Sequence, residues 1–337
     1  MAKMKIAVVP KPGADFVIEE REIPAPGAGQ VRIKVQACGV CASDHFVKEG
    51  LVPWIQYPRS PGHEVAGVID EVGSGVTLWK KGQRVGVGWH GGHDFTCINC
   101  RRGDFINCVN EKWTGIHYDG GYAEYVVVPW EAVAAMPDGL DPVEAAPLLC
   151  AGITTFNSVR RAGALPGDLV AVLGVGGLGH LGIQYANKFG YKTVAISRGK
   201  ESEALAKKLG AHVYLDSDAV NAAEELKKLG GAKVILSTAP SGKAMTALVD
   251  GLGANGTMLV IGAGPDPISV TAAQLIFGNK AVKGWASGTA VDSEDTLRFS
   301  EYTGVRPMIE KFPLEKVNDA WARMVSGKAQ FRVVLTM

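Results

Sequence analysis

Short apolar runs broken by glycine and proline dominate the first half of the chain. In these runs valine and isoleucine recur at close intervals, a composition typical of β-strands rather than helices. We expect strands at four places: Val31–Val35, Val65–Val72, Arg84–Val87 and Tyr122–Val128. Because the runs are short and separated by turn residues, they predict an irregular, mostly antiparallel, barrel-like β domain.

From Leu169 onward apolar strand-like runs alternate with amphipathic stretches. The strand-like runs are Leu169–Gly174, Thr193–Ser197, Val213–Leu215, Lys233–Ser237, Met258–Ile261 and Ala281–Trp285. Helices are expected near Gly177–Phe189 and Glu201–Leu209. Strands that alternate with helices predict a parallel, doubly wound sheet, so the fold class is α/β.

The last part of the chain departs from this rhythm. It predicts a helix near Ser293–Tyr302, a helix near Leu314–Met324 and a final strand at Phe331–Leu335. We interpret this tail as returning to the first domain. The predicted division is therefore a β domain of residues 1–151 and 290–337, and an α/β domain of residues 152–289.

Composition narrows the possible partners. The chain has 337 residues, enough for about two domains, and a formal net charge of +1. We therefore expect no general attraction to nucleic acid or to an acidic membrane surface. No apolar stretch of about 18 residues is present, and we see no secretory signal at Met1–Pro10. The six cysteines then favour free thiols or metal ligands over disulfides, and we expect a cytoplasmic protein.

A glycine-rich turn follows the first strand of the α/β domain. The pattern GxGxxG comprises Gly174, Gly176, Gly177, Leu178 and Gly179. The first glycine permits a tight turn, the second lets the backbone approach a pyrophosphate, and the third allows close packing of helix on strand. Because the motif lies between a predicted strand and a predicted helix, it predicts a dinucleotide site rather than a plain turn.

The end of the second strand bears on the choice of cofactor. An acid at that point would bind the ribose hydroxyls of NAD, but the sequence has Ser197, Arg198 and Lys200. A hydroxyl and two cations suit a 2′-phosphate, which favours NADP. NAD stays possible, with Glu201 as a substitute acid.

Two cysteines and one histidine are candidates for a zinc site with an open fourth position. They are Cys41, His63 and Cys150, which are far apart in sequence. Spacing alone does not join them, and each could instead be a buried core residue.

These segments resemble the zinc-containing alcohol dehydrogenases of the medium-chain dehydrogenase/reductase superfamily. The similarity lies in Gly62–Gly67, which reads GHEVAG, in Gly120–Tyr125, which reads GGYAEY, and in the glycine turn. It implies a GroES-like catalytic domain and a Rossmann domain. It also implies hydride transfer between a nicotinamide cofactor and a small alcohol, aldehyde or ketone. The alternatives are a reductase of aromatic or unsaturated aldehydes and a non-catalytic NADP-binding protein on the same scaffold.

The resemblance also implies roles for single residues. Cys41, His63 and Cys150 would hold a catalytic zinc, which Glu64 could approach transiently, while Asp44 would orient His63. The remaining roles concern substrate and cofactor: Ser43 would contact the substrate oxygen and begin a proton relay, Thr154 would pack behind the nicotinamide, and Arg332 would lie near the pyrophosphate.

A second cluster resembles the structural zinc lobe of the same family, with one departure. Cys97, Cys100 and Cys108 match three of the four usual cysteines, and Asp94 stands at the first position. Three thiolates and a carboxylate can close a tetrahedral site, although the harder ligand should lower the affinity. The alternatives are an empty lobe held by packing and a site that uses His93.

Other departures concern the outer end of the proton relay, where the family often has a histidine. This chain has Phe46 at that position and His45 one residue earlier. A further departure concerns the cofactor phosphates: Ala42 stands where many members of the family carry a cation near them. Phe46, Trp54 and Trp89 could line the substrate pocket or belong to the core. Family habit implies a homodimer or homotetramer, in which Ala281–Trp285 would pair across a two-fold axis if it lies at a sheet edge.

Overall fold

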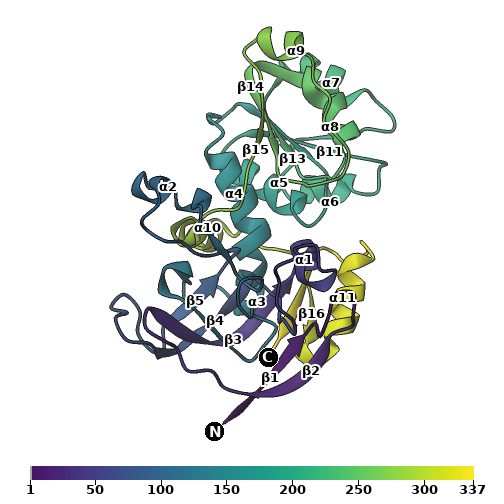
Figure 1. Cartoon of the computed structure of the whole chain (residues 1–337). Helices are drawn as coiled ribbons and strands as arrows, with labels where there is room; N and C mark the ends of the chain where they lie inside the picture. The colour runs from purple at the N-terminus through teal and green to yellow at the C-terminus, as the bar shows by residue number, and fades with distance from the viewer. Residues whose placement is uncertain (1) are drawn as a thin grey trace. The chain divides into compact units, whose positions relative to one another are not determined.

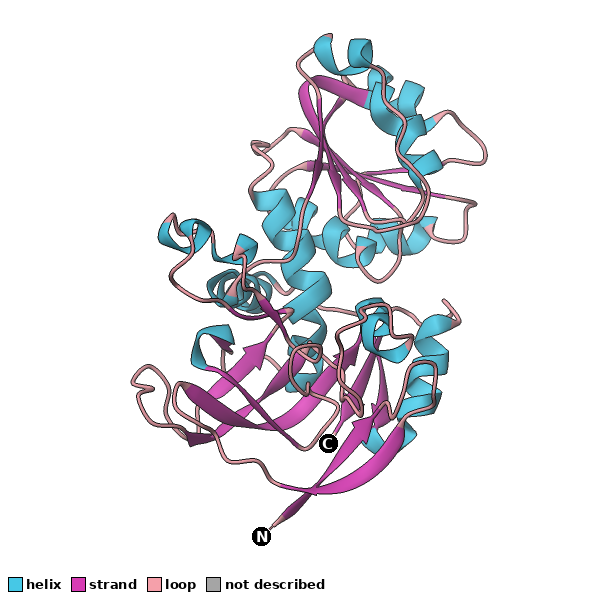
Figure 2. Ribbon diagram, in the orientation of Figure 1, coloured by secondary structure: helices cyan, strands magenta, loops and turns pink. Residues whose placement is uncertain are grey.

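The computed structural model describes residues 2–337 and divides into two compact units. Unit 1 comprises Met1–Ile153 and Gly288–Met337, and unit 2 comprises Thr154–Ser287. These junctions lie two residues from those expected from the sequence. The α/β fold class is confirmed: unit 1 is mostly β, and unit 2 is a parallel sheet covered by helices (Figures 1 and 2).

Unit 1 is built around a seven-stranded sheet in which β16, β17, β3, β4, β5 and β9 are neighbours in that order, with β8 also paired to β3. The strands of unit 1, including those outside this sheet, are β1 (Lys3–Val8), β2 (Val17–Glu22), β3 (Gln30–Val40), β4 (Val65–Val72), β5 (Arg84–Val87), β6 (His90–Gly92), β7 (Lys112–Trp113), β8 (Tyr125–Pro129), β9 (Val133–Ala135), β16 (Ile309–Pro313) and β17 (Arg332–Thr336). All pairs in this sheet are antiparallel except β16 with β17.

Short helical segments connect these strands. They are η1 (Ala42–Asp44), α1 (His45–Lys48), α2 (Ile98–Arg101), η2 (Phe105–Asn107), η3 (Trp130–Ala132), α3 (Pro142–Pro147), η4 (Leu148–Gly152), α10 (Ala290–Thr303), η6 (Leu314–Lys316) and α11 (Val317–Val325). Along β3 the side chains alternate, with Val31, Ile33 and Val35 buried in the core. That alternation is the reason the sequence forms a half-buried strand here.

Unit 2 is a six-stranded parallel sheet with the order β12-β11-β10-β13-β14-β15. Its strands are β10 (Leu169–Leu173), β11 (Lys192–Ser197), β12 (Val213–Asp216), β13 (Ala232–Ser237), β14 (Leu252–Val260) and β15 (Ala281–Gly284). Its helical segments are α4 (Ile153–Arg160, of which Ile153 belongs to unit 1), α5 (Gly179–Lys188), α6 (Glu203–Lys208), α7 (Ala222–Lys228), α8 (Gly242–Leu248), η5 (Val249–Gly251) and α9 (Ala272–Ile276).

Both faces of this sheet are covered, as its apolar strands require. All five residues of β10 are buried: Val170 and Val172 pack with α5 and α6, whereas Ala171 packs with α7 and α8. The strand order reverses between β10 and β13, which is the point where ligands bind in doubly wound sheets. The glycine turn follows β10 directly, so the sequence places it at this reversal.

Several element boundaries differ from the sequence prediction for identifiable reasons. The strand expected from Tyr122 begins at Tyr125, because the backbone N–H groups of Gly120, Gly121 and Tyr122 donate to carbonyls of residues 60–62 instead. The helix expected at Ser293 begins at Ala290, because Thr289 and Asp292 form a capping box. β14 begins at Leu252 rather than Met258, with an irregularity in its pairing to β13.

The sequence prediction missed β1 and β2, which form an antiparallel pair. β2 reads VIEERE and has no fully buried position, so it lacks the apolar alternation by which strands are recognised. In the part of the chain that the structure describes, no helix is long and apolar enough to cross a membrane.

Candidate metal centre and cofactor site

Four potential metal ligands converge within unit 1. One ligand atom from each of Cys41, His63, Glu64 and Cys150 lies within 4.8 Å of the others, and all four side chains are buried or nearly so. Cys41 follows β3, His63 and Glu64 precede β4, and Cys150 lies on η4. Pairing of β3 with β4, which aligns Cys38 with Val65, therefore brings the first three together across two neighbouring strand ends.

The geometry of this cluster fits a zinc ion. The two sulfur atoms of Cys41 and Cys150 are 3.7 Å apart. A tetrahedral zinc with sulfur ligands at about 2.3 Å would hold two sulfurs about 3.8 Å apart. The Nε2 atom of His63 is buried and makes no hydrogen bond, and a buried polar atom without a partner is costly unless a ligand completes it.

Asp44 holds His63 in place through a carboxylate in which each oxygen has two hydrogen-bond partners. Its Oδ1 lies 3.0 Å from His63 Nδ1 and accepts a bond from the backbone N–H of Gly62, while its Oδ2 accepts from the backbone N–H of Cys41 and the hydroxyl of Tyr122. With Nδ1 held by the carboxylate, Nε2 is the atom left to face the sulfurs. Tyr122 belongs to the GGYAEY motif, but the motif alone does not indicate that its hydroxyl bonds Asp44.

Charges within the cluster alter the pKa of each ligand. The hydrogen bond between the sulfurs of Cys41 and Cys150 lowers the pKa of Cys41 and raises that of Cys150. Burial opposes a charged His63, but the carboxylate of Asp44 and the thiolate of Cys41 outweigh it and raise the pKa of His63. Because a bound zinc needs two thiolates and a neutral imidazole, metal binding must release protons from this cluster.

Glu64 is enclosed beside the cluster by an arginine from the C-terminal strand. The guanidinium of Arg332 donates to Glu64 Oε1, and burial raises the pKa of Glu64 to about 8 although this arginine opposes the shift. Glu64 Oε2 and Arg332 Nε have no hydrogen-bond partner. A Cβ on Gly39 would lie 1.7 Å from Glu64 Oε2, so glycine is needed there to leave room for the carboxylate.

The second cysteine cluster lies in the loop between β6 and β7. Ligand atoms of Asp94, Cys97, Cys100 and Cys108 lie within 4.8 Å of one another, and the sulfurs of Cys97 and Cys108 are 3.9 Å apart. Backbone and side-chain N–H groups that donate to the carboxylate, the Cys97 amide foremost, keep the pKa of Asp94 far below its ordinary value. The neighbouring His93 is not part of this group of four; its ring instead packs on Phe105 and lies 3.0 Å from His90.

The glycine turn of unit 2 has the shape that a dinucleotide site requires. Gly174 has a φ of +98°, and a Cβ on Gly179 would lie 1.9 Å from the carbonyl oxygen of Gly174. A Cβ on Gly176 would meet nothing within 4 Å, so the backbone is open at the position expected to approach the pyrophosphate. Leu178 precedes the first residue of α5, which places Gly177 and Leu178 at the helix N-terminus.

The remaining predicted residues occupy separate positions. Ser197 ends β11, and Arg198 and Lys200 lie in the loop that follows. The backbone N–H of Gly199, in that loop, donates to the carboxylate of Asp216, which ends β12. Ser43 lies on η1 and is half-buried, and Thr154 is the second residue of α4. His45 stands edge-on to Trp321 with ring centroids 4.6 Å apart.

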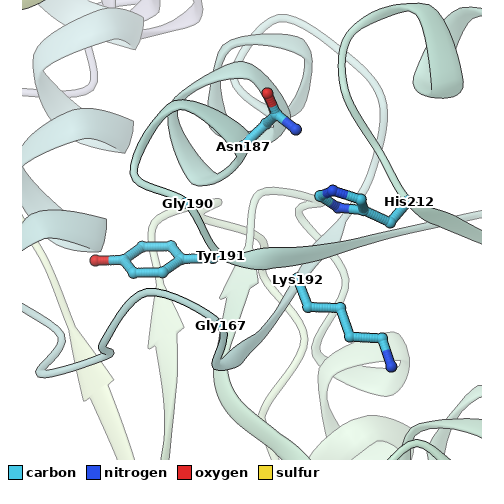
Figure 3. Close-up of a pocket in the computed structure, with 6 residues that line it drawn as sticks. All are labelled: Gly167, Asn187, Gly190, Tyr191, Lys192 and His212. Atoms are coloured by element: carbon cyan, nitrogen blue, oxygen red, sulfur yellow. The ribbon is translucent and has the colours of Figure 1, made fainter.

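A separate hollow of about 260 Å³ opens at the amino ends of β10 and β11 (Figure 3). Its lining consists of Gly167, Asn187, Gly190, Tyr191, Lys192 and His212. It contains none of the residues expected from the sequence, and the glycine turn stands at the opposite, carboxyl edge of the sheet. The hollow therefore lies away from the carboxyl edge, which is where ligands bind in doubly wound sheets.

Two known protein families match separate parts of the chain. Residues 27–138 match the alcohol dehydrogenase GroES-like domain, and residues 177–302 match the zinc-binding dehydrogenase domain. The chain thus belongs to the zinc-dependent alcohol dehydrogenase family. It is an oxidoreductase that interconverts alcohols with aldehydes or ketones by hydride transfer to or from a nicotinamide cofactor.

Individual relatives cover nearly the whole chain. The alcohol dehydrogenase patD of Penicillium expansum is 45% identical over 99% of this chain and 97% of its own. The cinnamyl alcohol dehydrogenase SbCAD4 of Sorghum bicolor superposes with a TM-score of 0.88 at 32% identity, covering 99% of this chain and 98% of the other. A CAD from Helicobacter pylori complexed with NADP(H) superposes with a TM-score of 0.86 at 27% identity, covering 99% and 98%.

Proposed function

We propose that Cys41, His63 and Cys150 hold the catalytic zinc of this dehydrogenase, and that Glu64 is an alternative ligand. The observation that supports this most is the buried, unpartnered Nε2 of His63, which faces two sulfurs at tetrahedral spacing. A zinc in such a site lowers the pKa of an alcohol and polarises a carbonyl.

The surrounding side chains then orient the ligands and move a proton. Asp44 keeps His63 in the tautomer whose Nε2 can bind a metal. The Ser43 hydroxyl would receive the substrate proton while it gives its own proton to solvent water, because a hydroxyl can donate and accept at once. The ion pair between Arg332 and Glu64 keeps the Glu64 carboxylate beside the cluster. When the cofactor is bound, Arg332 is proposed to lie near its pyrophosphate, and Thr154 to pack behind its nicotinamide.

We propose NADP(H) as the preferred cofactor. Ser197, Arg198 and Lys200 supply a hydroxyl and two cations after β11, and guanidinium groups bind phosphate through paired hydrogen bonds. The Oδ1 atom of the nearby Asp216 already accepts the backbone N–H groups of Gly199 and Asp218, which leaves only its Oδ2 for ribose hydroxyls. The likeness to a protein complexed with NADP(H) supports the same choice.

Steady-state kinetics with NADP and NAD test this proposal. We expect a higher kcat/KM with NADP, and we expect Arg198→Ala to lower that value about tenfold while it changes the NAD value little. One hydrogen bond to a charged group contributes about 1.5–3 kcal/mol, and a loss of about 1.4 kcal/mol corresponds to a tenfold lower kcat/KM. Lys208→Ala, which removes a cation from the far end of α6, is the control. A preference for NAD, or an equal loss with both cofactors in Arg198→Ala, contradicts the proposal.

A continuous aromatic surface in unit 1 favours substrates with flat, conjugated groups. The ring of Trp89 stands edge-on to His63 at 5.0 Å and stacks on Trp113 at 5.5 Å, and Trp54 lies 6.2 Å from Trp113. Trp54 remains 49% exposed, so one end of this surface is free to contact a ligand. The same assay, run with an aromatic and a short aliphatic alcohol, should give the higher kcat/KM for the aromatic one.

The second cluster is proposed to bind a structural zinc through Asp94, Cys97, Cys100 and Cys108. Its support is the 3.9 Å separation of the Cys97 and Cys108 sulfurs and the carboxylate of Asp94, whose pKa hydrogen bonds keep far below its ordinary value. All six cysteines are free thiols, as metal binding requires, and a reducing compartment such as the cytoplasm would preserve them.

We also propose a homodimer or homotetramer joined through β15. This strand is the last of its sheet, and three of its four residues are exposed. Phe277, shortly before it, is 76% exposed. An uncovered strand edge with apolar neighbours is suited to pairing with a second copy.

A further inference from the structure

We infer that Asn110 is a positioning residue that makes Asp94 an effective metal ligand in the second cluster. The inference rests on the structural zinc proposed above for that cluster. Asn110 holds a metal ligand in place and is not a ligand itself.

The fold places Asn110 opposite Asp94. β6 and β7 pair antiparallel with Gly92 aligned to Lys112, and continuing this register by two residues aligns Asp94 with Asn110. The two residues therefore stand at the base of the loop that carries the cysteines. The side-chain amide of Asn110 closes this base, because its Nδ2 donates to Asp94 Oδ2 at 2.6 Å.

Asn110 also contacts the ligand at the other end of the loop. Its backbone N–H donates to Cys108 Sγ at 3.4 Å, and the backbone N–H of Asp94 donates to the same sulfur at 3.4 Å. A single residue thus touches both the first and the last ligand of the cluster. The side-chain bond and the backbone bond can be separated experimentally, since a substitution at 110 removes only the former.

The hydrogen bond from the Asn110 side chain restricts which position of the Asp94 carboxylate can bind a metal. A carboxylate offers about four lone-pair positions over its two oxygens. Oδ1 accepts the backbone N–H groups of Thr96 and Cys97 at 2.8 and 2.9 Å, and Oδ2 accepts Asn110. The fourth position, on Oδ2, is then left for a metal, since a bound zinc would take the place of the Cys100 thiol hydrogen that also contacts this carboxylate. Without Asn110 that oxygen has two open positions and less constraint on where it points.

The requirement is specific to a carboxylate at position 94. A cysteine there would present one sulfur atom, with no choice between two ligand atoms and no second oxygen to orient. We therefore expect Asn110 to matter when residue 94 is aspartate and to become dispensable in Asp94→Cys. A general loosening of the loop would instead appear with either residue at position 94.

The experiment measures zinc release from the holoenzyme to a coloured chelator, for the wild type, Asn110→Ala, Asp94→Cys and the double variant. Two zinc ions should be released in two kinetic phases. The phase that is missing in His63→Ala belongs to the catalytic zinc. The control is Asn107→Ala, in the same loop, because the Asn107 amide bonds Asp104 and no ligand. Outer-shell partners of metal ligands typically contribute about 10–100-fold to affinity.

We expect Asn110→Ala to release the second zinc about tenfold faster than the wild type, Asn107→Ala to leave that rate unchanged, and Asp94→Cys to be insensitive to Asn110→Ala. Equal rates in Asn110→Ala and Asn107→Ala would overturn the inference, as would equal acceleration in the Asp94→Cys background. A wild-type enzyme with only the catalytic phase would overturn the structural zinc as well, which distinguishes that failure from failure of the Asn110 role alone.

Discussion

Cys41→Ser is expected to lower kcat/KM by at least about a thousandfold, because a metal that acts as a Lewis acid contributes several kcal/mol and about 1.4 kcal/mol is tenfold. The substitution replaces a sulfur that lies 3.7 Å from Cys150 and removes the soft anionic ligand that zinc prefers. The protein should stay folded, because Cys41 follows the end of β3 and the core of unit 1 is built from the strands themselves. Steady-state kinetics, zinc content and a thermal unfolding curve measure the three quantities.

Cys38→Ser is the matched control for this prediction. Cys38 is also buried and only three residues away, but its thiol donates to the carbonyl of Gly39 and its sulfur is not among the four converging ligands. Its substitution should leave zinc content near the wild-type value. Near-normal turnover in Cys41→Ser, or equal losses in both variants, would show that Cys41 has no special role.

Asp44→Asn is expected to weaken binding of the catalytic zinc about 10–100-fold. The carboxylate accepts four hydrogen bonds at a site that is 2% exposed, and a carboxamide must turn an NH₂ group toward some of those donors. His63 then loses the charged partner that fixes its tautomer. Zinc affinity measured by competition with a chelator tests this prediction.

Two variants show whether the effect comes from the contact with His63. Tyr122→Phe removes one of the four bonds to Asp44 and should cause a smaller loss of zinc affinity. Asp119→Asn changes a carboxylate that bonds Arg59 and the backbone of Ser60 outside the cluster, and it should change zinc affinity little. If Asp44→Asn binds zinc as tightly as the wild type, the proposed role of Asp44 is wrong.

The sequence predicted the α/β fold because both kinds of apolar pattern are strong. β10 is apolar at all five positions, as a strand covered on both faces must be, and β3 alternates. The glycine turn was predictable because its context is local: a strand, three spaced glycines and a helix start within a dozen residues. The family assignment, made from short motifs, is confirmed by domain matches and by relatives across the chain.

The contacts around the metal cluster were less accessible from the sequence. Glu64 and Arg332 are separated by 268 positions, and no local pattern indicates that β17 brings the guanidinium to that carboxylate. Tyr122 reaches Asp44 across 78 positions for the same reason. The bond from Asn110 to Asp94 could have been found only with the register of two very short strands, which sequence periodicity does not resolve.

Cys41, His63 and Cys150 are proposed to bind one zinc ion together. This can be tested with diffraction data collected on both sides of the zinc absorption edge, from crystals of protein purified with zinc. We expect an anomalous peak enclosed by the two sulfurs and His63 Nε2, whether or not the second cluster also shows one. A map with no peak among these three atoms, despite zinc in the crystal, would contradict this proposal.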